Sequence, residues 1–294
     1  MTTYLKPRSS LARALYEKQK IDDYLTHFDK SQWYKCNLTK LSSEITSHFV
    51  QLNVDEETSC FLKQSEEKSD WIFTQLWHSI AKVLLGWFMT QTSVNGWLER
   101  GSMFVLSHLQ FLSLMSCDGD WDSNSLLDLG AGDGKVTANL APAFEQVFVT
   151  EVSHVMRKHL QKRKFKVLGI EDWQRNNKFN VISCLNLLDR CDKPLTLLKD
   201  IKDTLTPNGR LIVALVLPFS SYVETGSLDH TPSEKLPIRG STFEEQVECI
   251  INDVFKPLGF ILLTWSKVPY LCEGDLRQSY YWLNDAIFIF KNAQ

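Results

Sequence analysis

A glycine-rich turn follows a short apolar stretch near the middle of the chain. Residues 126–129 read Leu-Leu-Asp-Leu, and residues 130–134 read Gly-Ala-Gly-Asp-Gly. Glycines in such a turn allow positive φ angles and let a ligand lie directly against the backbone. A dinucleotide site would place the third glycine one residue later, as Gly-x-Gly-x-x-Gly. The turn therefore predicts a site for a different adenosine-containing cofactor.

Acidic residues around the turn indicate which cofactor it fits. Asp133 lies inside the turn, where a negative charge would repel a pyrophosphate but suits ammonium and sulfonium groups. Glu151 follows by about 20 residues, the spacing at which an acid accepts hydrogen bonds from ribose hydroxyls. Asp172 comes after a third apolar stretch, where an adenine amino group would lie. This pattern predicts S-adenosylmethionine; the alternative is a tight turn with two surface acids. The predicted cofactor contacts are Asp128, Gly130, Gly132, Glu151, Asp172 and Asn186.

Two polar residues follow the fourth predicted strand. Asn186 and Asp189 lie within the sequence CLNLLDRCD at 184–192. Ligands of open α/β sheets lie beyond the carboxyl ends of the strands, so both side chains should face the methyl donor. The chain has no Asn/Asp-Pro-Pro-Tyr/Phe sequence and no Pro-Cys pair, which disfavours methylation of nucleobases. An alternative role for Asp189, and equally for Asp192, is to cap the next helix.

Composition and charge narrow the class of protein. The 294 residues, 44% hydrophobic and 23% charged, are typical of a globular chain with one or two domains. The net charge is 32 − 35 = −3, which does not favour binding to nucleic acid, and we interpret the basic run at 157–166 as a solvated helix face. The seven cysteines include no Cys-x-x-Cys pair, and the seven histidines include no His-Glu-x-x-His spacing. We therefore expect neither a disulfide framework nor a metal site.

Short apolar runs alternate with amphipathic helical segments from about Asn124 onward. This alternation predicts a parallel sheet with right-handed crossovers, and the last two strands, with no helix between them, predict an antiparallel hairpin at one edge. We predict an α/β, Rossmann-like, seven-stranded S-adenosylmethionine-dependent methyltransferase fold over 118–294, with a helical N-terminal extension over 1–117. The predicted strands cover 125–130, 146–152, 165–170, 179–188, 211–218, 260–268 and 286–290.

Apolar spacing in the N-terminal extension predicts helices over 31–50, 66–89 and 107–115. The stretch 71–89 has about the length of a membrane span. Thr74, His78 and Lys82 recur every four residues, however, and form a narrow polar stripe along it. We interpret the stretch as a heavily buried helix and expect no stable membrane span; a spanning helix is the alternative.

Longer stretches carry a resemblance to a known family. DLGAGDG at 128–134, CLNLLDRCD at 184–192, EEQV at 244–247 and PYLCEGD at 269–275 resemble the DREV family of methyltransferase-like proteins, the protein-L-histidine N-pros-methyltransferases. The resemblance runs from about Trp33 to the end of the chain. It implies the fold predicted above and S-adenosylmethionine-dependent methylation of the pros (Nδ1) nitrogen of histidine in His-x-His motifs of proteins, where x is small.

The resemblance also implies roles for single residues. Asn186 and Asp189 match reaction-centre positions, and Tyr281 matches an aromatic residue of the substrate pocket. We predict that Asp189 accepts the Nε2–H of the substrate imidazole, while Asn186 orients either that ring or the cofactor. Glu171-Asp172-Trp173 differs from the Asn-Glu-Trp of relatives, which leaves the adenine contact open.

Acids and aromatic residues gather in the loops after the last strands, where a peptide channel would need them. Both kinds of side chain suit the second, partly protonated histidine of a His-x-His motif. The alternative for each is an ordinary surface loop. The predicted substrate-binding residues are Tyr222, Glu224, Glu273, Tyr280 and Tyr281, with Tyr270 and Asp275 nearby.

The expected partners are protein substrates bearing His-x-His motifs, with no nucleic acid, and we expect a monomer. The first residues show no signal peptide and lack the apolar segment with which family members can begin, so we expect a cytoplasmic or organelle-associated protein. Two other functions remain open. One is methylation of a small molecule, and the other is a non-catalytic cofactor-binding scaffold, against which Asp128, Glu151 and Asp189 argue.

Overall fold

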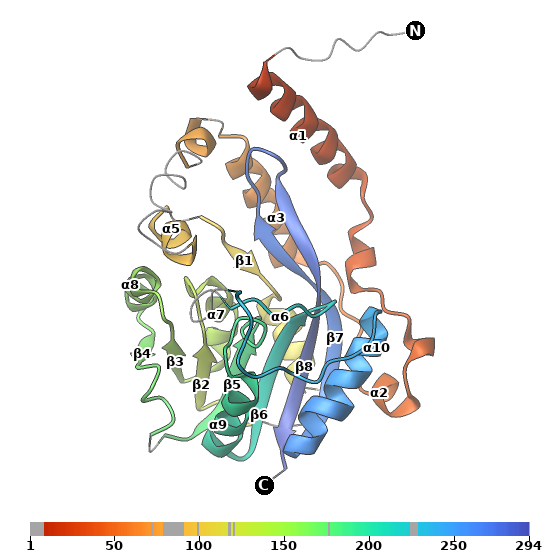
Figure 1. The fold of residues 1–294 in the computed structure, drawn as a ribbon, viewed down its shortest axis with the longest axis vertical. Coiled ribbons are helices and arrows are strands. Elements are labelled where there is room, and N and C mark those ends of the chain that lie inside the picture. The colour runs from red at the N-terminus through yellow and green to blue at the C-terminus, as the bar shows by residue number, and fades with distance from the viewer. Residues whose placement is uncertain are drawn as a thin grey trace.

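The computed structural model describes residues 9–71, 73–78, 91–98, 100–116, 119, 121–175, 177–223 and 229–293. Within these residues, eight strands form one sheet in the order β1-β7-β8-β6-β5-β2-β3-β4 (Figure 1). The strands are β1 (Met103–Phe104), β2 (Ser125–Leu129), β3 (Gln146–Thr150), β4 (Lys166–Leu168), β5 (Phe179–Leu185), β6 (Leu205–Val216), β7 (Phe260–Glu273) and β8 (Tyr280–Asn292).

Five neighbouring strands, from β4 to β6, run parallel, as the alternation of strands and helices predicts. Leu129 at the end of β2 pairs with Thr150 of β3 and with Cys184 of β5. The carboxyl ends of these three strands therefore meet at one edge of the sheet. The segments between the strands contain α7 (Lys135–Leu140), the 3₁₀ turn Ala141–Ala143, α8 (His154–Lys162) and α9 (Pro194–Thr204).

The last two strands form the predicted antiparallel hairpin, and β8 lies between β7 and β6. The hairpin is longer than predicted, because pairing continues from Val268 to Glu273 on β7 and from Tyr280 to Asp285 on β8. The predicted α/β fold is confirmed, but the sheet has an eighth strand. Met103 and Phe104 pair with the end of β7, in a region where we expected only helices.

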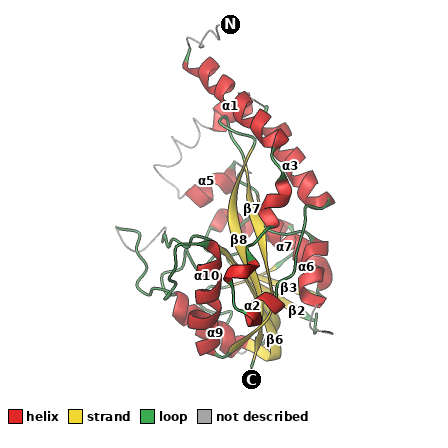
Figure 2. Cartoon of the chain, turned by 90° about the vertical axis from the view of Figure 1, so that its right-hand side faces the viewer, coloured by secondary structure: helices red, strands yellow, loops and turns green. Residues whose placement is uncertain are grey.

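Helices cover both faces of the sheet (Figure 2). On β8, Phe288 and Phe290 pack in one core with α9 and with α10 (Phe243–Cys249), whereas Ile287 and Ile289 pack in the other core with α6 (His108–Met115). This follows from the alternation of side chains along a strand. The helix of α10 continues through a π-helical turn at Ile250–Phe255 and a 3₁₀ turn at Lys256–Leu258.

The N-terminal part differs most from the prediction. The continuous helix expected over 31–50 is wrong, since this stretch forms two 3₁₀ turns and a five-residue helix at Ser43–Ser47 and then reaches a bridge between Phe49 and Trp265 of β7. Its aromatic side chains Trp33 and Tyr34 are buried in the core beside α6, which holds the chain irregular there. The elements are α1 (Ser10–His27), the 3₁₀ turns Lys30–Tyr34 and Leu38–Lys40, α2 (Ser43–Ser47), α3 (Glu56–Ser69) and α5 (Gln91–Trp97).

Helix α3 starts earlier than predicted because Asp55 caps it by accepting from the Thr58 amide, and it ends at Ser69. Half of the expected helix over 66–89, residue 72 and residues 79–89, lies outside the described residues. In the described half the helix is interrupted after Ser69, and Phe73 and Trp77 are exposed, so a continuous, heavily buried helix is wrong there. In the part of the chain that is described, no helix combines the length and apolarity needed to cross a membrane. The helix expected over 107–115 is confirmed as α6, with a capping box formed by Ser107 and Gln110.

Candidate functional site

The glycine turn connects β2 to α7 at the edge where β2, β3 and β5 end. Gly130 has φ +70°, and a Cβ there would lie 2.9 Å from the Leu187 side chain. Gly132 has φ +56°, and a Cβ there would meet nothing within 4 Å. Gly130 is thus needed for packing, while Gly132 leaves open space beside its backbone, where a ligand can approach.

Asp128 lies beneath this turn and is almost fully buried. Its two carboxyl oxygens accept hydrogen bonds from Thr137 Oγ1 at 2.5 Å and from Ser183 Oγ at 2.6 Å. Burial raises the pKa of Asp128 to about 6, against the effect of these two hydrogen bonds. The side chain connects β2 with β5 and α7, so it fixes the shape of the turn; a direct cofactor contact stays a prediction.

Glu151 follows the end of β3 and faces the turn. Its Oε2 accepts from the Gly132 amide at 2.9 Å and its Oε1 from the Ser153 amide at 2.8 Å. These two bonds orient a nearly buried carboxylate beside the open space at Gly132. Each oxygen retains a lone pair for a hydroxyl donor. The arrangement fits a ribose, and it brings Glu151 and Gly132 together as predicted from the sequence.

Asp172 follows the end of β4 and lies on the surface. Its side chain is 63% exposed and pairs with Arg175 at 3.1 Å, while the neighbouring Trp173 is buried. Its described contacts do not connect it with Gly132 or Glu151. A contact between Asp172 and adenine therefore stays a prediction.

Asn186 and Asp189 lie at the end of β5, next to the cofactor loop. Asn186 has φ +53°, and its backbone N–H donates to the Ala214 carbonyl at 2.9 Å. Asp189 is 7% exposed; its Oδ2 accepts from Arg190 Nε at 3.1 Å, and its Oδ1 is buried without a hydrogen-bond partner among the described residues. Burial raises the pKa of Asp189, although the charge and hydrogen bond of Arg190 oppose this.

The two helix-capping alternatives find no support. Helix α9 has Lys193 at its N-cap position, without a side-chain cap. Asp192 instead accepts hydrogen bonds from the amide and hydroxyl of Ser233, both at 2.8 Å. Asp189 is therefore available to a ligand, whereas Asp192 fixes a loop.

Sequence reasoning missed a further acid at this site. Asp285, near the middle of β8, is fully buried, and its Oδ2 accepts from Asn186 Nδ2 at 2.8 Å. Burial raises the pKa of Asp285 to about 8, and the negative charge of Asp189 acts in the same direction. The signal that could have found it is an acid directly before the apolar run at 286–290, in a strand buried on both faces.

Of the predicted substrate residues, Tyr222 contacts Asp189 directly. Its amide donates to the Asp189 carbonyl at 2.7 Å, and its ring stacks on His230 with centroids 4.4 Å apart. The Arg190 guanidinium lies 5.6 Å from the centre of the same ring. Tyr222 thus covers the outer side of the Asp189–Arg190 pair. Glu224 lies outside the described residues.

Tyr280 and Tyr281 point to opposite faces of β8, as neighbours on a strand do. Tyr280 is fully buried and packs edge-on against Trp33, at 6.1 Å between ring centroids. Tyr281 is partly exposed and donates its hydroxyl to Asp275 Oδ1 at 3.0 Å. Burial and then the charge of Asp275 raise the pKa of Tyr281 to about 12. Only Tyr281 of this pair offers surface to a substrate in this structure.

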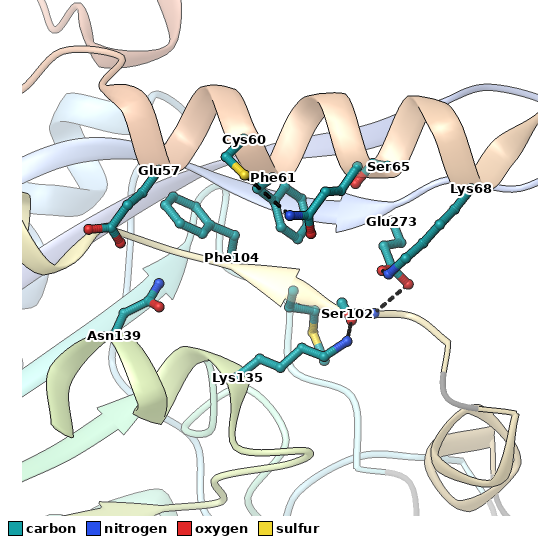
Figure 3. Close-up of a pocket in the computed structure, with 12 residues that line it drawn as sticks. Glu57, Cys60, Phe61, Ser65, Lys68, Ser102, Phe104, Lys135, Asn139 and Glu273 are labelled. Carbon is teal, nitrogen blue, oxygen red and sulfur yellow. Dashed lines mark hydrogen bonds and ion pairs between the residues drawn. The ribbon is translucent and has the colours of Figure 1, made fainter. Parts of the chain in front are cut away.

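Glu273, at the end of β7, forms an ion pair with Lys68 of α3 at 2.5 Å and accepts from the Ser102 amide at 3.1 Å. Burial acts to raise the pKa of Glu273, but the hydrogen bond and charge of Lys68 outweigh it and the pKa is lowered. Figure 3 shows this pair at one end of a cavity of about 260 Å³ between α3, β1 and α7. Glu273 is therefore already neutralised by the protein.

The chain is similar to known proteins. The family model "DREV methyltransferase" matches residues 33–292. The ubiquinone biosynthesis O-methyltransferase of Actinobacillus pleuropneumoniae serotype 5b (strain L20) is 30% identical over 105 residues, which cover 31% of this chain and 45% of that protein. The mitochondrial ubiquinone biosynthesis O-methyltransferase of Schizosaccharomyces pombe is 22% identical over 173 residues, 54% of this chain and 62% of that protein. The chain thus spans less than two thirds of these relatives.

Among solved structures, N-methyltransferase NodS from Bradyrhizobium japonicum WM9, in complex with S-adenosyl-L-homocysteine, is similar with a TM-score of 0.43 and 16% identity, over 64% of this chain and 86% of that one. An S-adenosylmethionine-dependent methyltransferase from Clostridium acetobutylicum is similar with a TM-score of 0.42 and 13% identity, over 76% of this chain and 99% of that one.

The span matched by the family model contains the whole glycine turn, Glu151 and the end of β5. S-adenosylmethionine is the methyl donor that this turn and its carboxylate fit. The chain belongs to the DREV methyltransferase family.

Proposed function

We propose that the protein methylates the pros (Nδ1) nitrogen of histidine in His-x-His motifs of proteins, with S-adenosylmethionine as methyl donor. The observation that carries this proposal is the buried, unpartnered Oδ1 of Asp189 next to Asn186, at the strand end beside the cofactor loop. The resemblance of CLNLLDRCD and PYLCEGD to protein-histidine methyltransferases supports the choice of substrate.

A neutral imidazole has one N–H and one lone pair, so attack by Nδ1 requires the hydrogen to be on Nε2. Asp189 Oδ1 is an acceptor for that Nε2–H and thereby selects the reactive tautomer. Arg190 occupies the other oxygen and opposes the effect of burial, so the carboxylate can remain ionised. When bound, S-adenosylmethionine supplies the electrophilic methyl carbon.

As the new N–C bond forms, positive charge develops on the ring. The negative charge of Asp189 stabilises this cation through the same Nε2–H contact, as a buried acid does for an imidazolium in hydrolases. The Nε2 proton then leaves by way of Asp189 to water. Asn186 holds either the ring or the cofactor in line, and such alignment supplies much of the rate.

Methylation of a small molecule is the second candidate. Two relatives of this chain are named as ubiquinone biosynthesis O-methyltransferases. An oxygen acceptor would require a base for a hydroxyl proton, a task that Asp189 could also serve.

The deciding experiment incubates the protein with S-adenosylmethionine labelled in its methyl group and a His-Ala-His peptide. The controls are a Gln-Ala-Gln peptide and a small phenol. We expect label in the His-Ala-His peptide alone, as pros-methylhistidine when the hydrolysed peptide is separated against both methylhistidine standards. Label only in the phenol would support the second candidate, and tele-methylhistidine would contradict the role of Asp189.

A further inference from the structure

Asp285 lies at the site edge of the sheet, near the middle of its strand. It pairs with Val216 at the end of β6 and with Val268 of β7. Strand β6 runs parallel to β5, whereas β8 runs in the opposite direction. The middle of β8, around Asp285, therefore lies where β5 and β6 end, and this brings Asp285 to Asn186.

The side chain of Asn186 is held from two directions. Its backbone amide donates to Ala214 of β6, and its Nδ2 donates to Asp285 Oδ2. An asparagine amide has a donor side and an acceptor side, and an acceptor next to one side decides which way it points. With Nδ2 fixed by Asp285, Oδ1 of Asn186 must face away from β8.

Three oxygens at this strand end are buried without a hydrogen-bond partner among the described residues: Oδ1 of Asn186, of Asp189 and of Asp285. Buried polar atoms are normally paired, so a group of them indicates where a ligand supplies hydrogen-bond partners. Asp285 also faces Tyr270 and Cys272 of β7, and Arg190 lies beyond Asp189.

Two ionised carboxylates side by side would repel each other. Burial raises the pKa of Asp285 to about 8, so this carboxyl is mostly neutral at pH 7, whereas Asp189 has the Arg190 guanidinium beside it, which favours the charged form. A neutral carboxyl still accepts from Asn186 through its carbonyl oxygen.

We propose that Asp285 is a positioning residue of the reaction centre, whose carboxyl group fixes the amide of Asn186 so that the amide oxygen faces the bound reactants beside Asp189. The kinetic part of its test rests on the proposed function, whereas the spectroscopic part does not.

The kinetic test is a double-mutant cycle with Asp285→Val and Asn186→Ala, followed by kcat on the His-Ala-His peptide. We expect each single change to lower kcat by about 10²-fold, since misalignment has effects of this order. The double variant should be no slower than the slower single variant, because Asp285 acts only through Asn186. Asp285→Asn retains a neutral acceptor and should recover most of the activity that Asp285→Val loses.

The matched control is Thr264→Val on β7. Thr264 is also buried, and its hydroxyl donates to the Leu114 carbonyl, away from the site. This change should lower the melting temperature and leave kcat unchanged. Additive losses in the double variant, or wild-type kcat in folded Asp285→Val, would overturn the proposal.

The spectroscopic test uses protein labelled with ¹⁵N-asparagine. The Nδ2 signal of Asn186, assigned by its loss in Asn186→Ala, should exchange slowly with water in the wild-type protein and in Asp285→Asn, and rapidly in Asp285→Val. Rapid exchange of the Asn186 Nδ2 hydrogens in the wild-type protein would by itself overturn the inference. This measurement does not require Asp285→Val to fold. If the peptide is not methylated, the proposed function fails and this measurement still decides the role of Asp285.

Discussion

The two oxygens of Asp189 have different surroundings. Oδ2 faces Arg190 and the Tyr222 ring toward the outside, while Oδ1 is buried and faces inward. A hydrogen bond to Oδ1 therefore forms in a place with little water, where it is electrostatically stronger than at the surface. In the proposed reaction, the position of this one carboxylate oxygen selects which nitrogen of the substrate imidazole carries the hydrogen.

Asp189→Asn should keep the fold and the affinity for S-adenosylhomocysteine but lower kcat by about 10²–10⁴-fold, because the amide has no charge to stabilise the imidazolium. Asp192→Asn is the control, since Asp192 is exposed and contacts only the Ser233 loop, so its kcat should remain near wild type. Steady-state kinetics and calorimetry check both. Full activity of Asp189→Asn together with an inactive Asp192→Asn would mean that the wrong carboxylate is assigned.

Asp285 also gives the protein a pH-dependent stability. Its pKa is raised to about 8 in the folded state, so between about pH 4 and 8 the native protein holds a proton that the unfolded chain has released. This contribution to stability is therefore lost as the pH rises through that window, by up to about 1.4 kcal/mol per pH unit. The free energies of unfolding of wild type and Asp285→Asn should be measured with denaturant at pH 5, 6, 7 and 8. The difference between the two proteins should shrink or change sign as the pH rises. Parallel curves would contradict a neutral Asp285.

At the scale of elements, the turn between β2 and α7 combines two kinds of glycine. Gly132→Ala should weaken S-adenosylhomocysteine binding, because the added methyl group enters the open space next to Glu151. Its left-handed backbone should lower the folding stability by only about 1–2 kcal/mol. Gly130→Ala should lower the melting temperature further, because its Cβ also meets the Leu187 side chain. Calorimetry and thermal unfolding of both variants test this. Equal affinity of Gly132→Ala and wild type for S-adenosylhomocysteine would contradict a ligand-binding surface at Gly132.

Glu151 connects β3 with the same turn. Glu151→Ala should weaken cofactor binding by about 1–3 kcal/mol, since ribose hydroxyls lose a charged acceptor and the Gly132 amide loses its partner. Asp172→Ala is the comparison, because Asp172 lies on the surface and pairs with Arg175. If calorimetry shows a larger loss of cofactor affinity for Asp172→Ala than for Glu151→Ala, the assignment of Glu151 as the main acidic contact of the cofactor is wrong.

At the scale of the whole molecule, an ion-paired group of side chains in the N-terminal helices forms hydrogen bonds to the β7–β8 hairpin. The nearly buried Lys18 of α1 contacts Asp22 at 2.6 Å, Asp70 at 2.9 Å and Ser279 at 3.4 Å, next to the start of β8. Burial alone would lower the pKa of Lys18, but the two carboxylates outweigh it and the pKa is raised.

Lys18→Met should lower the free energy of unfolding by about 1–3 kcal/mol, because Asp22 loses its charged partner and Ser279 loses a donor. Lys63→Met on the exposed side of α3 is the control and should change it by less than about 0.5 kcal/mol. Equal effects of the two changes in denaturant unfolding would show that these contacts do not stabilise the fold.

Most of the sheet and the cofactor loop could be predicted from the sequence, because strands buried on both faces appear as apolar runs and the turn requires glycine. The contacts that complete the site depend on pairing between distant residues. Asp285 reaches Asn186 only because β8 is antiparallel to β6, and Glu273 is neutralised by Lys68, which lies about two hundred residues earlier. The turns within 31–50 follow from burial of Trp33 and Tyr34, which overrides a helical pattern.

Strand β8 follows every other strand in the chain, yet lies between β7 and β6. During synthesis on the ribosome, the glycine turn and Glu151 emerge long before Asp285. The nascent chain can therefore form the cofactor loop early, but it has no complete reaction centre until translation has passed β8. A chain interrupted before Tyr280 lacks strand β8 and, with it, Asp285, the residue that we propose orients Asn186.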